Sequence, residues 1–313
     1  MHEMTGPMWM PSLPMTFDRL FSIHIQPVPI MLFGCLFLGA LYLWGVSRLH
    51  KRQVEWGFGR TLNFLIGLLL IIAVSETGIG GYSMALFSVH MAQHMVLNML
   101  APLFLLLGAP VTLALRALPS RSKSRRVLLR VLHSRFVAVI SHPGFSIPVF
   151  LISLYGLYFT SILDWAMSNA WTHYLMMIHF VAIGLLFFWP IMGIDPGPRK
   201  HSYPVRIGEL FLIMPFHAFF GISLMMSSGV ISTSFVGPQM WGVNAISDQY
   251  TGGAIAWAFA ELPTLIVLLA VVFAWTRSEE RAAKRYDRQA DRDNGAELDA
   301  YNARLQALAA RRP

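Results

Sequence analysis

Runs of about 20 apolar residues recur along this chain, and they limit its fold more than any other feature of the sequence. At 1.5 Å per residue, each run is long enough for a helix that crosses the hydrocarbon core of a bilayer. Only 13% of the residues are charged, against about 25% in a soluble domain. The sequence therefore predicts an all-α, polytopic membrane protein with seven transmembrane helices, near residues 28–49, 57–75, 84–107, 144–163, 171–189, 207–228 and 251–275.

The basic residues predict how these spans are oriented. Of the 24 lysines and arginines, 23 fall in the connections and the tail on one side of the predicted membrane, and only Arg19 falls on the other. Because basic residues are retained on the cytoplasmic side, we expect the N-terminus outside and the C-terminus inside. The formal charge of +8 is then explained by the topology, and these basic residues attract the anionic head groups of the lipid bilayer. No nucleic-acid partner is expected.

Three regions follow from this pattern. Residues 1–27 form an outer N-terminal segment that contains Met and His, residues 28–275 form the seven-helix membrane domain, and residues 276–313 form a charged cytoplasmic C-terminal tail. We expect the tail to be a solvated helix, because it is rich in Ala, Arg, Asp and Glu and carries no apolar stripe.

Ionisable side chains inside the predicted spans are few, and each needs a partner because an unsatisfied polar group in hydrocarbon costs several kcal/mol. His90 and His94 are four residues apart, which places both imidazoles on one face of a helix. Counting inward from the outer ends of the spans puts them, with His179, His217 and Glu261, at depths of about 9–16 Å. Four spans thus bring these side chains to one level, as a shared metal ion requires.

The composition indicates which metal this level would hold. The single Cys35 excludes a disulfide within the chain and a Cys-based zinc site. Thioether sulfur prefers Cu(I), and imidazole suits copper as well as zinc. We therefore expect copper, as Cu(I), at His90, His94, His217 and His179, with zinc able to substitute. Met91, Met95 and Glu261 are expected beside them, as further ligands or as groups that orient the imidazoles, and the residues expected to collect copper from outside are Met4, Met8, Met10, Met225 and Met226.

Structural roles remain the alternative for all these side chains. Methionine fills helix interfaces for packing reasons alone, and a histidine in a span is often satisfied by a neighbouring hydroxyl or carbonyl. We expect that structural role for His173, near the outer surface. His24 is expected to be solvated, and an interfacial place on the inner side is expected for His50, His133, His142 and His201. For Glu261, the roles of ligand, orienting group and proton carrier all stay open.

The segment His90-Met-Ala-Gln-His94-Met, followed by Ala101-Pro102 and Leu107-Gly108-Ala109-Pro110, resembles the caa3-type cytochrome c oxidase assembly factors, the CtaG-like membrane proteins. Three later segments are similar to the same family in the same order. They are His173 to His179 with Phe188-Trp189-Pro190 and Asp195-Pro196, then Pro215-Phe216-His217 with Gly221, and then Asp248-Gln249 with Gly252-Gly253, Trp257 and Glu261-Leu262-Pro263. The resemblance covers about 28–275, and it does not extend to the basic 116–135 connection or the tail.

This resemblance implies a non-catalytic role in maturing a haem–copper oxidase, by helping copper reach the CuB centre of the oxidase's large membrane subunit. It also implies a location in the bacterial inner membrane and periplasmic copper chaperones as further partners. Two other functions fit the residues alone. The same site could be a station on a path for copper across the membrane, although the inner halves of the spans contain Asn63 and Glu209 but no second cluster of His and Met. Alternatively, His94 with His179 or His217 could bind haem b.

Overall fold

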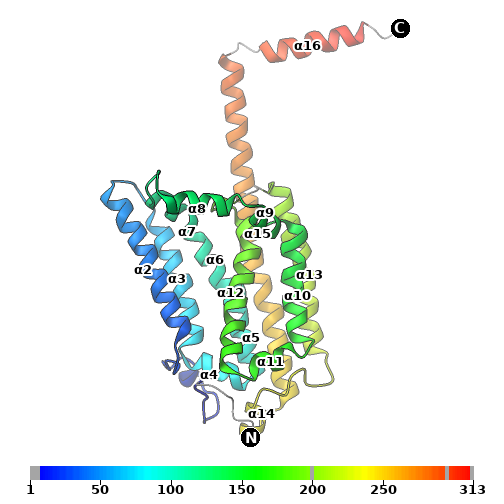
Figure 1. The fold of residues 1–313 in the computed structure, drawn as a ribbon. Helices are drawn as coiled ribbons and strands as arrows, with labels where there is room; N and C mark the ends of the chain where they lie inside the picture. Colours follow the sequence, from blue (N-terminus) through cyan, green and yellow to red (C-terminus); the bar gives the residue numbers. More distant parts are fainter. Residues whose placement is uncertain (1–7, 198–200, 293–295, 311–313) are drawn as a thin grey trace. The chain divides into compact units, whose positions relative to one another are not determined.

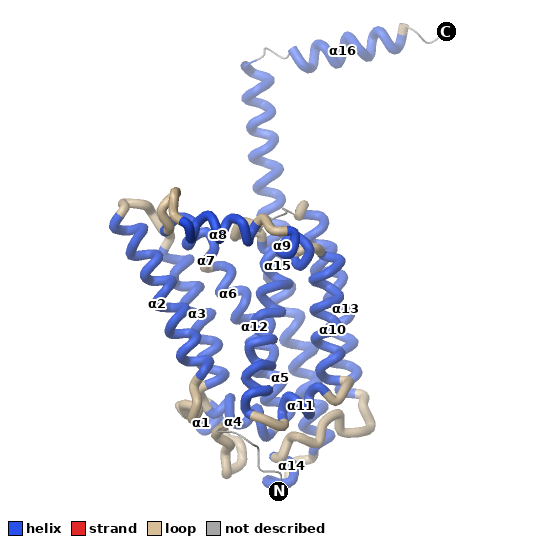
Figure 2. The backbone as a smooth tube through the Cα atoms, in the orientation of Figure 1, coloured by secondary structure: helices blue, strands red, loops and turns tan. Residues whose placement is uncertain are grey.

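The computed structural model describes residues 8–197, 201–292 and 296–310. These residues are helical apart from their loops and one isolated β-bridge between Ile23 and Thr77, and no strand occurs among them. Met4, one of the residues expected to collect copper, lies outside the described residues, as does His2. Figure 2 shows the helices in blue and the connections in tan.

Long, mostly apolar helices make up the membrane domain (Figure 1). The helices are α1 (Phe17–Leu20), α2 (Ile30–Lys51), α3 (Phe58–Ser75), α4 (Gly78–Ala85), α5 (Phe87–Met95), the π-helix η1 (Val96–Leu100), α6 (Ala101–Leu107), α7 (Pro110–Ala117), α8 (Lys123–Leu132), α9 (Arg135–Ile140), α10 (Pro143–Tyr158), α11 (Ile162–Met167), α12 (Ala170–Met192), α13 (Tyr203–Met225), α14 (Gly237–Trp241), α15 (Ala245–Arg292) and α16 (Ala296–Ala309). Within the described residues, six helical stretches are long and apolar enough to cross a membrane, namely α2, α3, Phe87–Ala117, α12, α13 and α15. The chain is therefore a multi-pass membrane protein.

The fourth expected span, residues 144–163, is shorter in the structure. Helix α10 has 16 residues and ends at Tyr158, which gives a length of about 24 Å. The hydroxyl of Thr160 donates to the Gly156 carbonyl and accepts from the Ile162 amide. Hydroxyl side chains that bond to the local backbone compete with the helix in this way, so the chain turns here and continues as the short helix α11.

The third expected span is built from three segments, α5, η1 and α6. Pro102 has no amide hydrogen for the Asn98 carbonyl four residues earlier, and the π-helical turn comes just before it. A Cβ added to Gly184 of α12 would come within 2.0 Å of that carbonyl oxygen. The α12 backbone therefore packs directly against η1, at a place where only glycine fits.

Two carboxylates from distant parts of the chain cap the two ends of this region. Asp248 accepts from the amide of Phe87 at 2.7 Å, and also from the amide and hydroxyl of Ser88. Asp195 accepts from the amides of Val111 and Thr112 at 3.0 and 2.8 Å. Because the first amides of a helix have no partner within the helix, these bonds hold α5 and α7 in place.

The two ends of the bundle differ. Helices α4, α11 and α14 lie at one end, and α8 and α9 run across the opposite end (Figures 1 and 2). The basic 116–135 connection, which matches no pattern in the sequence, contains the whole of α8. This helix buries Leu132 and exposes Arg126 and Arg130.

The chain divides into two compact units, Met1–Val267 and Leu268–Pro313. The second unit contains the rest of α15, which ends at Arg292, and α16. All side chains from Arg281 to Arg292 are exposed.

Candidate metal centre

His90 and His94 lie on α5 and are both buried. The hydroxyl of Tyr158, from the end of α10, lies between them. It is 3.0 Å from His90 Nε2 and 2.7 Å from His94 Nδ1. The i, i+4 spacing predicts that the imidazoles share a face, and the structure shows that a buried phenol joins them. Nothing in the sequence pattern singled out Tyr158.

A phenol has one O–H to donate, and its oxygen can accept. Tyr158 can therefore donate to one imidazole and accept an N–H from the other, which keeps both rings neutral and fixes their tautomers relative to each other. Nδ1 of His90 is then left over, and it is buried without a hydrogen-bond partner among the described residues. A buried nitrogen of this kind is costly unless something binds it.

His173 of α12 lies beside His90, with ring centres 6.4 Å apart. The sequence suggests a histidine satisfied by a neighbouring polar group, and the structure corrects this. His173 is fully buried, and neither of its ring nitrogens has a hydrogen-bond partner in the described part of the chain. Helix α12 packs against α10, α11 and η1, and the buried His173 lies within the bundle.

The other predicted histidines differ in their surroundings. His217 of α13 is buried with its ring centre 6.0 Å from that of Phe150, and its Nε2 has no partner among the described residues. His179 is exposed on α12, and its Nε2 is 2.6 Å from the Ser153 hydroxyl. His179 follows His173 by six residues, which turns it by about 120° to another face of the helix. The ring of Phe180 is stacked on that of His94 with centres 3.9 Å apart, and its centre is 6.4 Å from that of His179.

The remaining predicted residues vary in burial. Met91 and Met95 are fully buried beside the histidines on α5. Glu261 is half-buried on α15, and no hydrogen bond links it to a histidine among the described residues. The residues expected to collect copper lie near the surface, with Met226 exposed and Met8, Met10 and Met225 half-buried.

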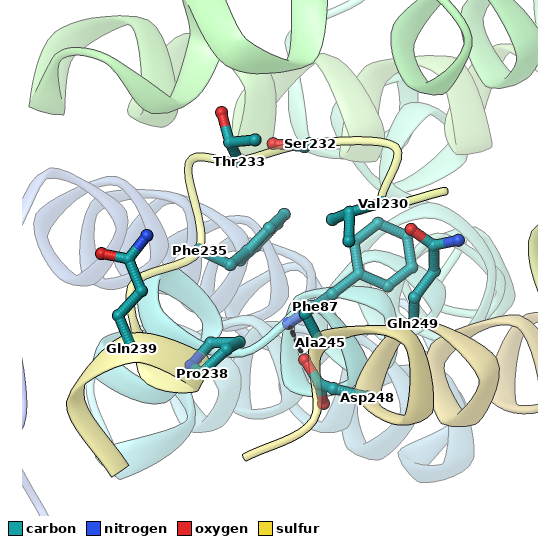
Figure 3. Close-up of a pocket in the computed structure, with 10 residues that line it drawn as sticks. All are labelled: Phe87, Val230, Ser232, Thr233, Phe235, Pro238, Gln239, Ala245, Asp248 and Gln249. Carbon is teal, nitrogen blue, oxygen red and sulfur yellow. Dashed lines mark hydrogen bonds between the residues drawn. The ribbon is translucent and has the colours of Figure 1, made fainter. Parts of the chain in front are cut away.

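Aromatic side chains enclose the histidines. The rings of His94 and Phe180 are stacked with centres 3.9 Å apart, and Phe235 lies 5.5 Å from His90. Phe87 and Phe235 also line a cavity of about 170 Å³ that includes Asp248 and Gln249 (Figure 3). This cavity therefore reaches the edge of the histidine cluster, with two phenyl rings between them.

No group of three or more His, Cys, Asp or Glu side chains in the described residues is arranged to hold a metal ion. A closed site with three or four ligands is thus not preformed. What the cluster offers is several buried imidazole nitrogens without partners, on His90, His173 and His217. A soft cation that accepts few ligands, such as Cu(I), fits this donor set.

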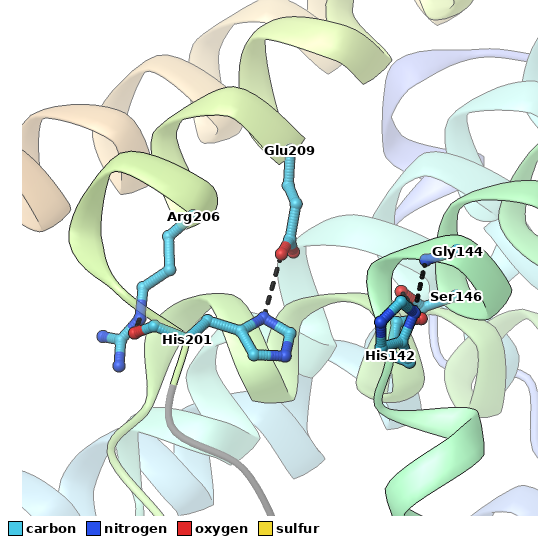
Figure 4. Close-up of polar contacts among 6 residues, drawn as sticks. All are labelled: His142, Gly144, Ser146, His201, Arg206 and Glu209. Carbon is cyan, nitrogen blue, oxygen red and sulfur yellow. Dashed lines mark hydrogen bonds and ion pairs between the residues drawn. The ribbon is translucent and has the colours of Figure 1, made fainter.

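A second polar cluster includes Glu209, which the sequence predicts in the inner half of a span. His201 Nδ1 is 2.9 Å from Glu209 Oε1, and Arg206 donates to the His201 carbonyl oxygen (Figure 4). His142 accepts from the Gly144 amide and caps α10. These histidines have local structural roles.

A family model described as cytochrome c oxidase caa3 assembly factor matches residues 40–278. The chain belongs to this family. This confirms the family that the His90–His94 segment and the three later segments predict.

Mycobacterial proteins are similar to this family member. Uncharacterized proteins of Mycobacterium bovis and Mycobacterium tuberculosis are each 46% identical to it over 275 residues, which is 85% of this chain. A protein of Mycobacterium leprae, also named as uncharacterized, is 43% identical over 279 residues, which is 87% of this chain. The matched part is 42% of each relative, so this chain spans about two fifths of their length. No solved structure matches it.

Proposed function

We propose that this assembly factor binds Cu(I) at the buried histidine cluster around His90 and His94 and helps deliver it to the CuB centre of a haem–copper oxidase. The observation that carries this proposal is the set of buried imidazole nitrogens without partners, in a bundle whose helix α5 also buries the thioethers of Met91 and Met95. Imidazole and thioether together suit Cu(I), although zinc can occupy similar ligands. The chain's role in this proposal is to bind and pass on copper, without catalysis.

The proposal includes a topology. The chain crosses the bacterial inner membrane seven times, with α10 as the fourth span, its N-terminus in the periplasm and its C-terminus in the cytoplasm. A 16-residue helix is short for a bilayer, and local thinning accommodates such a helix at modest cost. In this orientation the cluster lies in the outer half of the membrane, where periplasmic copper chaperones supply the metal and the large oxidase subunit receives it.

The packing of His94 opposes the haem alternative. Its Nδ1 is hydrogen-bonded to Tyr158, and its ring is stacked on Phe180. An axial haem ligand needs room for the porphyrin beside its imidazole, and Phe180 already covers one face of the His94 ring.

The experiment compares copper bound by the purified wild-type protein and by the double variant His90→Ala, His94→Ala. We expect the variant to insert and fold but to lose most of its copper, because it removes the centre of the cluster. His133→Ala is the matched control, since His133 is exposed in the basic connection. Equal copper in all three proteins would place the copper site elsewhere or show that there is none.

A further inference from the structure

His90 and His173 lie side by side in the interior, and neither has hydrogen-bond partners for both of its ring nitrogens. His90 has one nitrogen bound to Tyr158 and one without a partner, and His173 has two without partners among the described residues. Both side chains are fully buried. Three unsatisfied nitrogens on two adjacent rings are hard to explain by packing, because buried polar atoms nearly always have partners.

We propose that His90 and His173 are the two ligands of a two-coordinate Cu(I) ion and that Tyr158 is a positioning residue for His90. This assignment rests on the proposed function and specifies the site within it. It differs from the prediction made from the sequence, in which His94 and His217 were ligands and His173 was structural.

The separation of the rings fits such a pair. An imidazole nitrogen lies about 2 Å from a bound metal, so two imidazoles on opposite sides of one ion have their ring centres about 6 Å apart. The observed separation is 6.4 Å. Cu(I) has a filled d shell and is stable with two ligands in a line, so this site needs no third carboxylate, cysteine or histidine.

Tyr158 decides which His90 nitrogen is available. Its hydroxyl is bound at Nε2, so Nδ1 is the nitrogen that is left for the metal. The same hydroxyl is bound to His94 Nδ1, so His94 helps to hold the phenol in place. Hydrogen bonds that orient a metal-binding imidazole typically change metal affinity by about 10–100-fold.

The enclosure of the pair favours a metal that enters without water. Phe87, Phe180 and Phe235 surround His90 with ring centres 5.5–6.4 Å from it. A low-polarity surrounding with two neutral donors favours a monovalent soft ion over a hydrated divalent one.

The test titrates Cu(I) alone into the purified full chain in competition with a coloured Cu(I) chelator. We expect His90→Ala and His173→Ala each to weaken Cu(I) binding by more than about 100-fold, and Tyr158→Phe to weaken it by about 10–100-fold. His133→Ala, in the exposed basic connection, should stay within about threefold of the wild type. If His173→Ala does not fold, His173→Gln keeps the volume and polarity but offers no imidazole, and the same loss is expected.

X-ray absorption of the Cu(I)-loaded protein separates positioning from a structural role. The wild type and Tyr158→Phe should both show two nitrogen ligands, with only the affinity reduced in the variant. A purely structural Tyr158 would lower the melting temperature and leave the affinity unchanged, which would overturn its assignment. Wild-type affinity in a folded His173 variant would overturn the His90–His173 pair while the proposed function stands, whereas a wild type that binds no Cu(I) would overturn both.

Discussion

At the scale of single residues, the side chains around His90 come from three helices, with Tyr158 on α10 and His173 on α12 meeting His90 on α5. The spacing of His90 and His94 predicts two imidazoles on one buried face, and both are buried. Tyr158 could not be singled out, and the sequence assigns His173 a structural role, because nothing in a linear pattern tells which side chains of other helices meet that face. The bond from Tyr158 to both histidines depends on where α10 ends, two residues before Thr160.

Glu76, just after α3, gives a prediction about pH. Burial raises the pKa of this carboxyl, although it accepts a hydrogen bond from the Gln26 amide at 2.9 Å. Because the folded-state pKa is raised, Glu76 stabilises the fold most below its unfolded pKa, and this contribution is lost as the pH rises through the folded value. The melting temperature of the wild type in detergent should fall as the pH rises from about 4 towards neutral.

The variant Glu76→Gln keeps an acceptor for the Gln26 amide and cannot ionise. We expect it to melt higher than the wild type at neutral pH and to show a smaller fall with pH. An identical fall in both proteins would mean that other groups cause the pH dependence.

At the scale of helices, apolar runs predict where most spans lie, because length and hydropathy alone decide whether a helix can cross a bilayer. The predicted 57–75 and 171–189 correspond to α3 and α12 with small changes at the ends. Breaks within helices are harder to predict. The π-helical turn at η1 precedes Pro102, which lacks an amide hydrogen for the helix, and the early end of α10 precedes Thr160, whose hydroxyl bonds to the local backbone.

The contact of α12 with η1 predicts a strong effect of one methyl group. In Gly184→Ala the new Cβ would meet the Asn98 carbonyl oxygen, so the two helices must separate. We expect a loss of about 1–3 kcal/mol or more in stability, as in other overpacked cores. The measurement is thermal unfolding in detergent. Gly34→Ala in α2 is the matched control, because no atom lies within 4 Å of the position that its new methyl group would occupy, and equal stability of the two variants would contradict the close packing.

At the scale of the whole molecule, the distribution of basic residues predicts the orientation of the chain in the membrane. The number of spans needs a test because α10 is short. If α10 crosses the membrane, residues 159–169 lie outside. If it does not, they lie on the same side as α8. The all-helical class could be predicted from the sequence, because composition and run length determine it.

Alkaline phosphatase fusions test this topology. A fusion after Ser168 should be active and a fusion after Ser141 inactive, because phosphatase folds only outside the cytoplasm. A fusion at the C-terminus should also be inactive. An inactive Ser168 fusion would remove α10 from the spans, and an active C-terminal fusion would reverse the proposed orientation.

The copper content of the oxidase is the measurement that tests most directly whether this chain delivers the metal. The haem–copper oxidase would be purified from cells that lack the chain, and its copper and haem would be quantified. We expect haem to be present and the CuB copper to be absent, with the copper restored by the wild-type chain and by His133→Ala but not by His90→Ala, His94→Ala. An oxidase with full CuB occupancy in cells without the chain would contradict copper delivery by this protein.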